Sequence, residues 1–384
     1  MLPEGWKLSC LGDACSGALQ TGPFGSQLHA HEYTEHGISV LMPKDLINYR
    51  ANVETAAKIS IEKSEELKRH HLKFGDILFS RRGDVARLAL IDDNSKDSLC
   101  GTGCLRARPS TKNFAGFLFF FLQLPTIKSW LEHNAVGQTM PNMNTEILYE
   151  LPLILPPLPE QKKIAAILST WDRAIEGTEK LLANSQQQKK ALMQQLLTGK
   201  KRLRGFTGEW KKKTLSNVCQ IKTGKKDVNE GCENGEYPFF TCARQHTFSE
   251  NYSYDCEAIL IAGNGEVGKT HYYNGKFEAY QRTYILSDFT NISVFFILHF
   301  IEFFLPLDIS KEKQHGAMPY IKLGTLKDFS VVTPPIPEQR AIATVLTTAD
   351  EEIASLESDL SRLRQEKKAL MQQLLTGKRR VTVD

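Results

Sequence analysis

The sequence lacks the features that mark several common classes of protein. Its eight cysteines include no C-x-x-C pair, so the usual ligand spacing of a zinc site is missing. No apolar run reaches the roughly 20 residues that cross a bilayer, and the opening MLPEGWKLSC has no secretory-leader pattern. Lys and Arg number 48 against 44 Asp and Glu, so strong non-specific attraction to polyanions is not expected. We therefore expect a cytoplasmic protein with reduced cysteines, no membrane contact and no metal site.

One short stretch suggests a nucleotide-binding enzyme. Residues 263–270 read GNGEVGKT, which fits the pattern G-x-x-x-x-G-K-[ST]. That pattern binds phosphate where a strand leads through the turn into a helix, whose first amides face the phosphate. Residues 258–262 predict the strand, but the following HYYNGKFEAYQRTYIL is rich in aromatic and β-branched residues, which favours a second strand. We therefore expect a strand–turn–strand unit and no P-loop.

The chain contains a long internal repeat. The first copy contains KKALMQQLLTGKKR from Lys189, and the second contains KKALMQQLLTGKRR from Lys367. At the same offset, PPLPEQKKIAAIL from Pro156 matches PPIPEQRAIATVL from Pro334. Each copy follows a divergent unit of the chain. Within the divergent units, DILFSRRGDVARLAL, from residue 76, aligns with AILIAGNGEVGKTHY, from residue 258; we call this match the turn alignment. The glycine-rich turn therefore has a counterpart that lacks the P-loop lysine.

Each repeated segment predicts one long amphipathic helix. Pro159 with Glu160 is typical of a helix start, and Gly199 followed by three basic residues is typical of a helix end. Between them, positions spaced alternately by four and three residues form the seam of a coiled coil. The seam positions are Ile164, Leu168, Trp171, Ile175, Thr178, Leu182, Ser185, Lys189, Leu192 and Leu196, and in the second copy Ile342, Leu346, Ala349, Ile353, Leu356, Leu360, Leu363, Lys367, Leu370 and Leu374. A helix buried only against its own domain is the alternative.

These patterns predict an α+β protein with two mixed α/β units joined by two long helices. The predicted segments are 1–155 and 203–333 for the units, and 156–202 and 334–384 for the helices; the apolar stretches 114–124 and 292–305 are expected to be buried helices. A first helix over 160–197 is roughly 55–60 Å long at ~1.5 Å per residue, and the second unit follows its end. A second helix that pairs with it must run back, so we expect an antiparallel coiled coil with pseudo-twofold symmetry. Two inverted units suit two separated, inverted half-sites on a DNA duplex.

Three features carry a family resemblance: the repeated PPLPEQ and PPIPEQ segments, the helix ends KKALMQQLLTGK, and the unit openings EGWKLSCLGD and GEWKKKTLSN. In these features the chain resembles the specificity subunits of type I restriction-modification systems. The resemblance covers essentially the whole chain. It implies two target-recognition domains that each read half of a bipartite DNA site, and helices that dock the modification subunits. It also implies a non-catalytic chain without cofactors of its own. S-adenosylmethionine, ATP and magnesium are then expected on the partner modification and restriction subunits.

The expected DNA contacts are locally placed basic and amide side chains, because the two units together hold nearly as many acidic as basic residues. Arg can bind guanine through two hydrogen bonds, and Gln can bind adenine in the same way. The predicted DNA contacts are Arg81, Arg82, Arg87, Gln138, Lys225, Lys226, Arg244, Gln245, Lys269, Arg282 and Gln314. The predicted contacts to two modification subunits, one for each repeat, are Lys189, Lys190, Lys367 and Lys368. GPFGS, from Gly22, suits either a close approach to a partner or a structural hairpin.

Two other functional classes remain open. An enzyme would use the GKT at 268–270, or a nuclease-like set of Asp45 with Glu66 and Lys68, although an E-x-K triplet arises easily in the charged run EKSEELKRHHLK. A protein–protein adaptor would use the coiled coil without reading DNA. Two divergent units on nearly identical helices argue against the adaptor, since the divergence falls where targets would be read.

Overall fold

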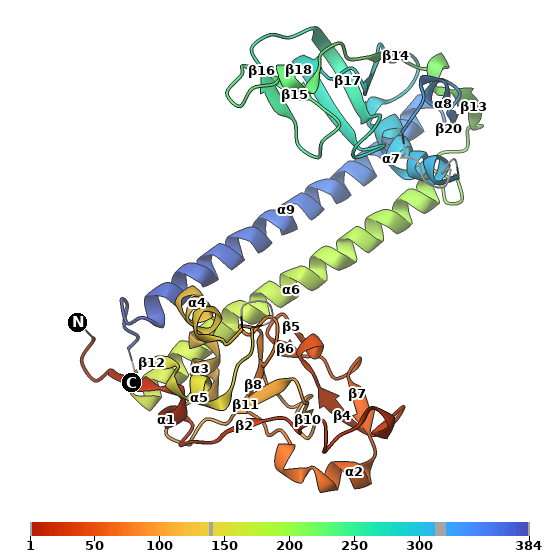
Figure 1. Cartoon of the computed structure of the whole chain (residues 1–384). Coiled ribbons are helices and arrows are strands. Elements are labelled where there is room, and N and C mark those ends of the chain that lie inside the picture. Colours follow the sequence, from red (N-terminus) through yellow and green to blue (C-terminus); the bar gives the residue numbers. More distant parts are fainter. Residues whose placement is uncertain (1, 138–140, 312–319, 383–384) are drawn as a thin grey trace. The chain divides into compact units, whose positions relative to one another are not determined.

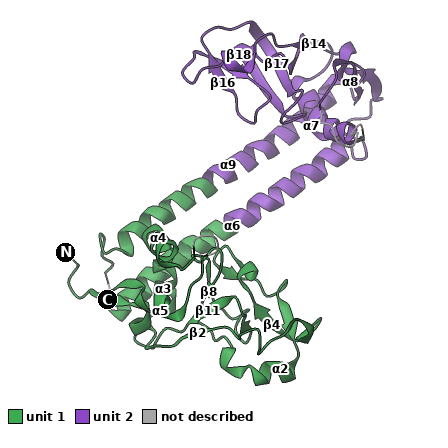
Figure 2. Ribbon diagram, viewed as in Figure 1, with its two compact units in different colours: residues 1–177, 360–384 green, residues 178–359 purple. Residues whose placement is uncertain are grey.

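The computed structural model describes residues 2–137, 141–311 and 320–382. The chain forms two compact units: residues 1–177 with 360–384 make unit 1, and residues 178–359 make unit 2 (Figure 2). Each unit contains one of the two divergent segments together with parts of both long helices. The boundaries predicted from the sequence separate the helices from the divergent segments. The two divisions differ because the two ends of each helix pack into different units.

The two long helices, α6 (Leu158–Leu196) and α9 (Ile336–Leu374), each have 39 residues (Figure 1). All the predicted seam positions are buried or half-buried, which confirms the heptad pattern. In unit 2, Lys189 pairs with Asp350, and Ser185 Oγ donates to Glu352 at 3.0 Å. Residue numbers rise along α6 as they fall along α9, so the segments run antiparallel. In unit 1, Glu160 pairs with Arg380 and Asp172 with Lys367, which shows the same direction.

Unit 1 contains three sheets and several short helices. A two-stranded antiparallel sheet pairs β1 (Lys7–Cys10) with β12 (Pro152–Leu155). The six-stranded sheet has the order β2 (Leu19–Thr21), β11 (Cys104–Ala107), β8 (Ile77–Ser80), β9 (Leu88–Leu90), β6 (Arg50–Ala51) and β5 (Leu46–Ile47). The four-stranded sheet has the order β10 (Leu99–Cys100), β4 (Ile38–Leu41), β7 (Ala57–Ile59) and β3 (Tyr33–Thr34). The α-helices are α1 (Leu11–Ala14), α2 (Ile61–Glu66), α3 (Ala115–Phe121), α4 (Pro125–Asn134) and α5 (Thr145–Glu150), and the 3-10 helices are η1 (Ala30–Glu32), η2 (Pro43–Asp45) and η3 (Lys68–His70).

Unit 2 repeats part of this plan. The two-stranded sheet pairs β13 (Lys211–Thr214) with β20 (Ser330–Thr333). The six-stranded sheet has the order β14 (Gln220–Thr223), β19 (Thr283–Ser287), β17 (Tyr254–Ala262), β18 (Thr270–Ala279), β15 (Tyr237–Phe240) and β16 (Thr247–Ser249). The helices are α7 (Val294–Lys311), α8 (Leu323–Lys327), η4 (Leu215–Asn217) and η5 (Val228–Glu230). The run β14-β19-β17-β18 corresponds to β2-β11-β8-β9 of unit 1, so the two units share a framework.

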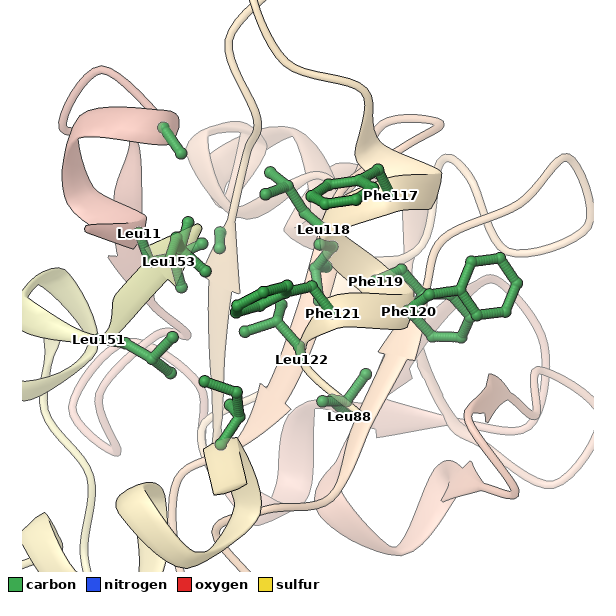
Figure 3. Packing of buried hydrophobic residues seen from close by; sticks show 14 of the residues in the cluster. Leu11, Leu88, Phe117, Leu118, Phe119, Phe120, Phe121, Leu122, Leu151 and Leu153 are labelled. Atoms are coloured by element: carbon green, nitrogen blue, oxygen red, sulfur yellow. The ribbon is translucent and has the colours of Figure 1, made fainter. Parts of the chain in front are cut away.

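The cores form where an apolar helix packs on the end of a long helix. In unit 1, Leu118 and Phe121 of α3 lie toward Leu11 and Leu153 (Figure 3), within a buried cluster that also contains Leu168 of α6. The unit 2 cluster joins α7 with the end of α6 and the start of α9. The expected buried helices over 114–124 and 292–305 are thus confirmed as α3 and α7. Within the described ranges, no helix has the length and apolar character needed to cross a membrane.

An identical glutamine anchors the apolar helix in each unit. The backbone N–H of Phe114 donates to Gln161 Oε1 at 2.8 Å, and the N–H of Ser293 donates to Gln339 Oε1 at 2.8 Å. Both glutamines are buried and belong to the repeated P-E-Q segments. Each satisfies a donor at the start of a helix, which has no partner inside that helix. The repeat therefore preserves the joint between a long helix and its unit.

Candidate nucleic-acid interface

The GNGEVGKT stretch forms a tight turn between two antiparallel strands. β17 leads through residues 263–269 into β18, with Ile261 opposite Thr270. Several amides of the turn donate to nearby carbonyls of the same unit: Gly263 to Arg282 O, Glu266 to Cys242 O, Gly268 to Ala262 O and Lys269 to Glu266 O. A P-loop needs free amides at the start of a helix to receive phosphate. The predicted strand–turn–strand is confirmed, and the nucleotide-binding interpretation loses its structural basis.

Unit 1 contains the same turn between β8 and β9, at residues 81–87; we call residues 81–87 and 263–269 the matched turns. In unit 1, Ser80 N donates to Arg87 O at 2.8 Å, and in unit 2 Ala262 N donates to Lys269 O at 2.9 Å. Three further backbone hydrogen bonds correspond in the two units. Arg81 N donates to Gly103 O as Gly263 N donates to Arg282 O, and Arg87 N donates to Asp84 O as Lys269 N donates to Glu266 O. Likewise, Met143 N donates to Arg81 O as Ile321 N donates to Gly263 O. The turn alignment is therefore correct in three dimensions.

A glycine with positive φ occupies the same place in both turns. Gly83 has a φ of +73° and Gly265 a φ of +61°, a left-handed conformation that favours glycine. A Cβ on Gly265 would lie 2.8 Å from Cys242 O, whereas one on Gly83 would meet nothing within 4 Å. The shared glycine thus serves the conformation of the turn rather than close packing in both units.

In unit 2, the matched turn lies beside three other loops that carry predicted DNA contacts. Backbone hydrogen bonds link these loops: Lys225 N to Ala279 O, Gln281 N to Lys226 O, Gly263 N to Arg282 O and Glu266 N to Cys242 O. The loops carry six predicted contacts: Lys225, Lys226, Arg244, Gln245, Lys269 and Arg282. All of these side chains are exposed except that of Lys226, which is half-buried and pairs with Glu230 at 2.7 Å. The structure thus gathers predicted contacts that are scattered along the sequence from position 225 to position 282.

A hollow of about 500 Å³ opens between these loops. Its lining includes Arg244 together with Asn264 and Glu266 of the matched turn, and Tyr280. Basic, amide, carboxylate and aromatic groups are the types that contact base edges and phosphates. Asn264 and Tyr280 are absent from the contacts predicted above. The turn alignment could have identified Asn264, because it places Asn264 opposite Arg82.

The three predicted arginines of unit 1 differ in exposure and in the contacts that their side chains make. Arg82 is exposed. Arg87 Nη1 donates to Pro43 O at 3.1 Å, and its Nε lies 3.5 Å from Asp84. Arg81 is half-buried, and its Nε finds no hydrogen-bond partner among the described residues. Arg82 is therefore the arginine of this turn that is most available to a ligand, while Arg87 also braces the turn. Gln138 and Gln314 lie outside the described residues.

Gly22, from the GPFGS stretch, packs against its own chain. A Cβ on Gly22 would lie 1.8 Å from Gly101 O, and a Cβ on Gly224 of unit 2 would lie 2.1 Å from Ala279 O. Each glycine follows a framework strand, β2 or β14, and donates to the carbonyl of a residue at the start of the neighbouring strand, at 3.0 Å. The structure therefore favours the structural interpretation of Gly22.

Two of the four predicted docking lysines hold the long helices together. The Lys189 and Lys367 side chains are each 15% exposed and pair with Asp350 and Asp172 of the facing helix. The Lys367 ammonium also lies 5.3 Å from the ring centroid of Phe120. Lysines engaged in this way offer little to a partner. Lys190 and Lys368 are exposed and stay candidates for docking.

His299, Glu302 and Asp350 form the one grouping in the described ranges with the ligand types and spacing of a metal site. His299 Nδ1 lies 3.4 Å from Glu302 Oε2 and 3.7 Å from Asp350 Oδ2. The Lys189 ammonium bonds to Asp350 and lies 3.9 Å from Glu302. Burial alone would raise the pKa of Glu302, but His299 and Lys189 lower this pKa overall. Lysine thus supplies the positive charge that these carboxylates require.

The two carboxylates of the nuclease-like set have structural partners. Asp45 is 1% exposed, and its Oδ2 accepts the N–H of Met42 at 2.8 Å, which caps η2. Glu66 is exposed and pairs with Lys63 at 2.9 Å.

All eight cysteines are free thiols, and burial raises the pKa of Cys15, Cys100 and Cys219 to about 12, so these thiols stay protonated.

Comparison with known proteins places the chain in a family. The type I restriction modification DNA specificity domain matches twice, over residues 3–184 and 207–364. The chain is 34% identical over 171 residues to the EcoDI type I specificity subunit of Escherichia coli, a match that covers 44% of this chain and 37% of that protein. It is 26% identical to the putative MjaX specificity subunit of Methanocaldococcus jannaschii, over 91% of this chain and 92% of that one.

Solved structures show the same fold. The type I S subunit from M. genitalium superposes with a TM-score of 0.70 at 17% identity, over 98% of both chains. A chain from a study of type I complex assembly superposes with a TM-score of 0.58 at 20% identity, over 99% of this chain and 100% of that chain. The two family matches cover most of the sequence and fall on the two halves that share the matched turn. The chain belongs to the family of type I restriction-modification DNA specificity subunits, which are non-catalytic.

Proposed function

We propose that this chain selects a bipartite DNA target, with each unit reading one half-site through its matched turn and the adjacent loops. The observation that supports this proposal most directly is the matched turn itself. The two units hold it with four corresponding backbone hydrogen bonds but present different side chains on it. A shared scaffold with different exposed residues is the arrangement expected when two halves of a target differ in sequence.

Locally placed positive charge supports duplex binding in unit 2. Arg244 lines the hollow, and Lys225, Lys269 and Arg282 are exposed on the loops beside it. These side chains can neutralise phosphates while the hollow receives a base edge. Phosphate contacts fix the register of a protein on DNA, and base contacts supply sequence choice. The near balance of charge over the whole chain then makes binding depend on these sites and on partner subunits.

We further propose that the chain docks two modification subunits and, through the assembled complex, the restriction subunits. The two repeated segments give each unit an equivalent stretch of long helix, and Lys190 and Lys368 are exposed at the same position of each copy. In this proposal, S-adenosylmethionine, ATP and magnesium belong to those partners, and the complex acts on DNA in the cytoplasm. Native mass spectrometry of the co-expressed complex should show two modification subunits for each chain. A stable complex that accepts only one would contradict the equivalence of the repeats.

A domain exchange tests the reading of half-sites. Residues 203–333 would be replaced by the corresponding segment of a specificity subunit with a known target, and methylated positions would be mapped with the reconstituted complex. We expect one half-site to change and the other to stay as in the parent. The control is the parent complex mapped in the same way. A complex that assembles normally but methylates without regard to sequence would instead favour an adaptor that does not read DNA.

A further inference from the structure

The matched turns present different side chains at one equivalent position. Arg82 in unit 1 and Asn264 in unit 2 both precede the glycine with positive φ. Each also follows directly after a residue, Arg81 or Gly263, whose N–H and C=O are both hydrogen-bonded to neighbouring segments in the same way. The two side chains therefore leave equivalent points of the same scaffold.

Neither side chain is used by the fold. Arg82 is exposed, Asn264 is half-buried in the lining of the hollow, and neither side chain makes a hydrogen bond or an ion pair within the described parts of the chain. The Arg82 carbonyl, by contrast, accepts a hydrogen bond from Ser80 Oγ at 2.8 Å, which holds its backbone. A fixed backbone that carries an uncommitted polar side chain is suited to contacting a ligand.

The charge at this position argues for base contacts over phosphate contacts. Five residues further along each turn, a positive charge is kept in both units, as Arg87 and Lys269. Positive charge strengthens a phosphate contact whatever the sequence of the DNA, so the Arg87 and Lys269 position fits that role. At the Arg82 and Asn264 position the charge is not kept, and a cation is exchanged for a neutral amide. Such a change suits a position that follows the base sequence of each half-site.

The two side chains have different preferences among the bases. Two guanidinium N–H groups of Arg can donate to O6 and N7 of guanine in the major groove. The Asn amide donates to N7 of adenine and accepts from its N6 amino group. We propose that Arg82 reads a guanine in the half-site bound by unit 1, and that Asn264 reads an adenine in the half-site bound by unit 2. This inference rests on the proposed function and adds the base class for one position in each half-site.

Exchange variants test the inference. Arg82→Asn, Arg82→Gln and Asn264→Arg would each be assembled with the modification subunits, and methylated sites would be selected from a randomised DNA library. We expect Arg82→Asn and Arg82→Gln to change one position of the first half-site from guanine to adenine, and Asn264→Arg to change one position of the second from adenine to guanine. Each change should shift the preference at that position by about tenfold to a hundredfold, and other positions should stay the same.

Control variants carry similar changes of charge elsewhere. Lys96→Asn alters an exposed cation in the loop that follows the C-terminal end of β9, away from the matched turn. Asn274→Arg alters an exposed amide in β18. Neither variant should change base preference. Thermal unfolding identifies any variant that fails to fold, and the remaining exchange variants then decide. Folded variants that keep the parental bases, or that weaken all sequences equally, would overturn the inference. A parental complex without any base preference would instead overturn the proposed function.

Discussion

The two units surround the same lysine of the long-helix repeat with different side chains. In unit 1, Lys367 pairs with Asp172 and faces the Phe120 ring of α3. In unit 2, Lys189 pairs with Asp350, and α7 places two further titratable groups beside it, His299 and Glu302. The lysine and aspartate are identical in the two repeats, while the helix packed on them has diverged. One joint therefore has an aromatic neighbour, and the other is a network of charges.

This difference shows where the two units have been free to diverge. The framework contacts are shared, but the charged network reaches the strand that follows the matched turn of unit 2, because Thr270 Oγ1 donates to Glu302 Oε1 at 3.1 Å. Thr270 comes directly after Lys269. In unit 1 the corresponding strand begins with buried Leu88. Equivalent substitutions in the two units should therefore have unequal effects, and their sizes test the comparison.

The largest expected effect is on the buried carboxylates at the starts of the long helices. Arg202 binds Glu338, which is 0% exposed, through two nitrogens, and Arg380 does the same for Glu160. Arg202→Ala should cause the larger loss of stability, because it leaves a buried charge without a partner. Arg380→Ala should cost less stability, because Trp6 Nε1 still donates to Glu160 at 3.0 Å.

Urea denaturation of the full chain, with hydrogen exchange to assign the loss to a unit, measures this difference. Lys201→Ala and Arg379→Ala are controls at exposed neighbouring positions and should change stability by less than about 0.5 kcal/mol. The corresponding tryptophan of unit 2, Trp210, has a buried Nε1 without a hydrogen-bond partner among the described residues. Equal losses for the two arginine variants would show that the Trp6 hydrogen bond contributes nothing.

A pH-dependent loss of stability is expected in unit 1. Burial, with Arg69 and Arg106 nearby, lowers the pKa of His70 from 6.5 to about 4. His70 Nδ1 lies 3.1 Å from Thr21 O, and His70 Nε2 accepts from Arg69 Nε at 2.9 Å, which suits the neutral ring. The folded state thus binds fewer protons than the unfolded state between these pKa values. Stability is present above pH 6.5 and falls by up to about 3 kcal/mol as the pH drops to about 4.

His70→Gln keeps one donor and one acceptor and should remove this contribution to the pH dependence. Unfolding free energies at several values between pH 7 and pH 4 check it, with His133→Gln, at an exposed position, as the control. A wild-type slope that persists unchanged in His70→Gln would assign the effect to other groups.

The third effect compares the two lysine joints. Lys189→Met leaves Glu302 and Asp350 facing each other and should destabilise unit 2 by about 2 kcal/mol. Lys367→Met leaves only Asp172, which is 36% exposed, and should cost about 1 kcal/mol or less. The lowered pKa of Glu302 means that its contribution is present above the ordinary value of 4.5 and is lost as the pH falls below it. Lys189→Met should lose less stability than wild type on acidification below pH 4.5. Equal costs for the two variants would contradict the comparison.

The long-range design could be predicted from the sequence because it is repeated. The two helices, their antiparallel direction and the strand–turn–strand of residues 258–272 follow from the helix repeat, the turn alignment and residue periodicity. The role of Lys189 and Lys367 could not be predicted. From the sequence alone, a lysine at a seam position could either dock a partner or pair within the chain. Only the facing Asp350 and Asp172 show that it pairs within the chain.

The candidate DNA site was predictable only in part. Basic residues in turns pointed to loops of unit 2 that lie together in the structure, since turns at strand ends are where exposed charge collects. Their proximity depends on how β15, β17 and β19 pair, and the register of non-neighbouring strands is not written in local patterns. Asn264 was overlooked because a neutral residue in a glycine-rich turn reads as turn chemistry. Only the comparison of the two turns places Asn264 opposite Arg82.

The smallest expected effect concerns the positive charge kept in both matched turns. Lys269 is exposed and makes no ion pair in the described part of the chain, whereas Arg87 also binds Pro43 O and Asp84. Lys269→Ala should weaken DNA binding to all sequences alike and lower the salt slope by about one, since it removes one phosphate contact. Arg87→Ala should do the same and also lower stability by about 0.5–1.5 kcal/mol, because it removes a hydrogen bond that braces the turn. Titrations of the reconstituted complex with target and non-target DNA at several salt concentrations measure the first effect, and thermal unfolding measures the second.

ATP binding by the isolated chain that Lys269→Ala abolishes would return the turn to the nucleotide-binding class. Loss of affinity at a single base position would make Lys269 a base-reading residue, and the separation of roles along the matched turn would fail.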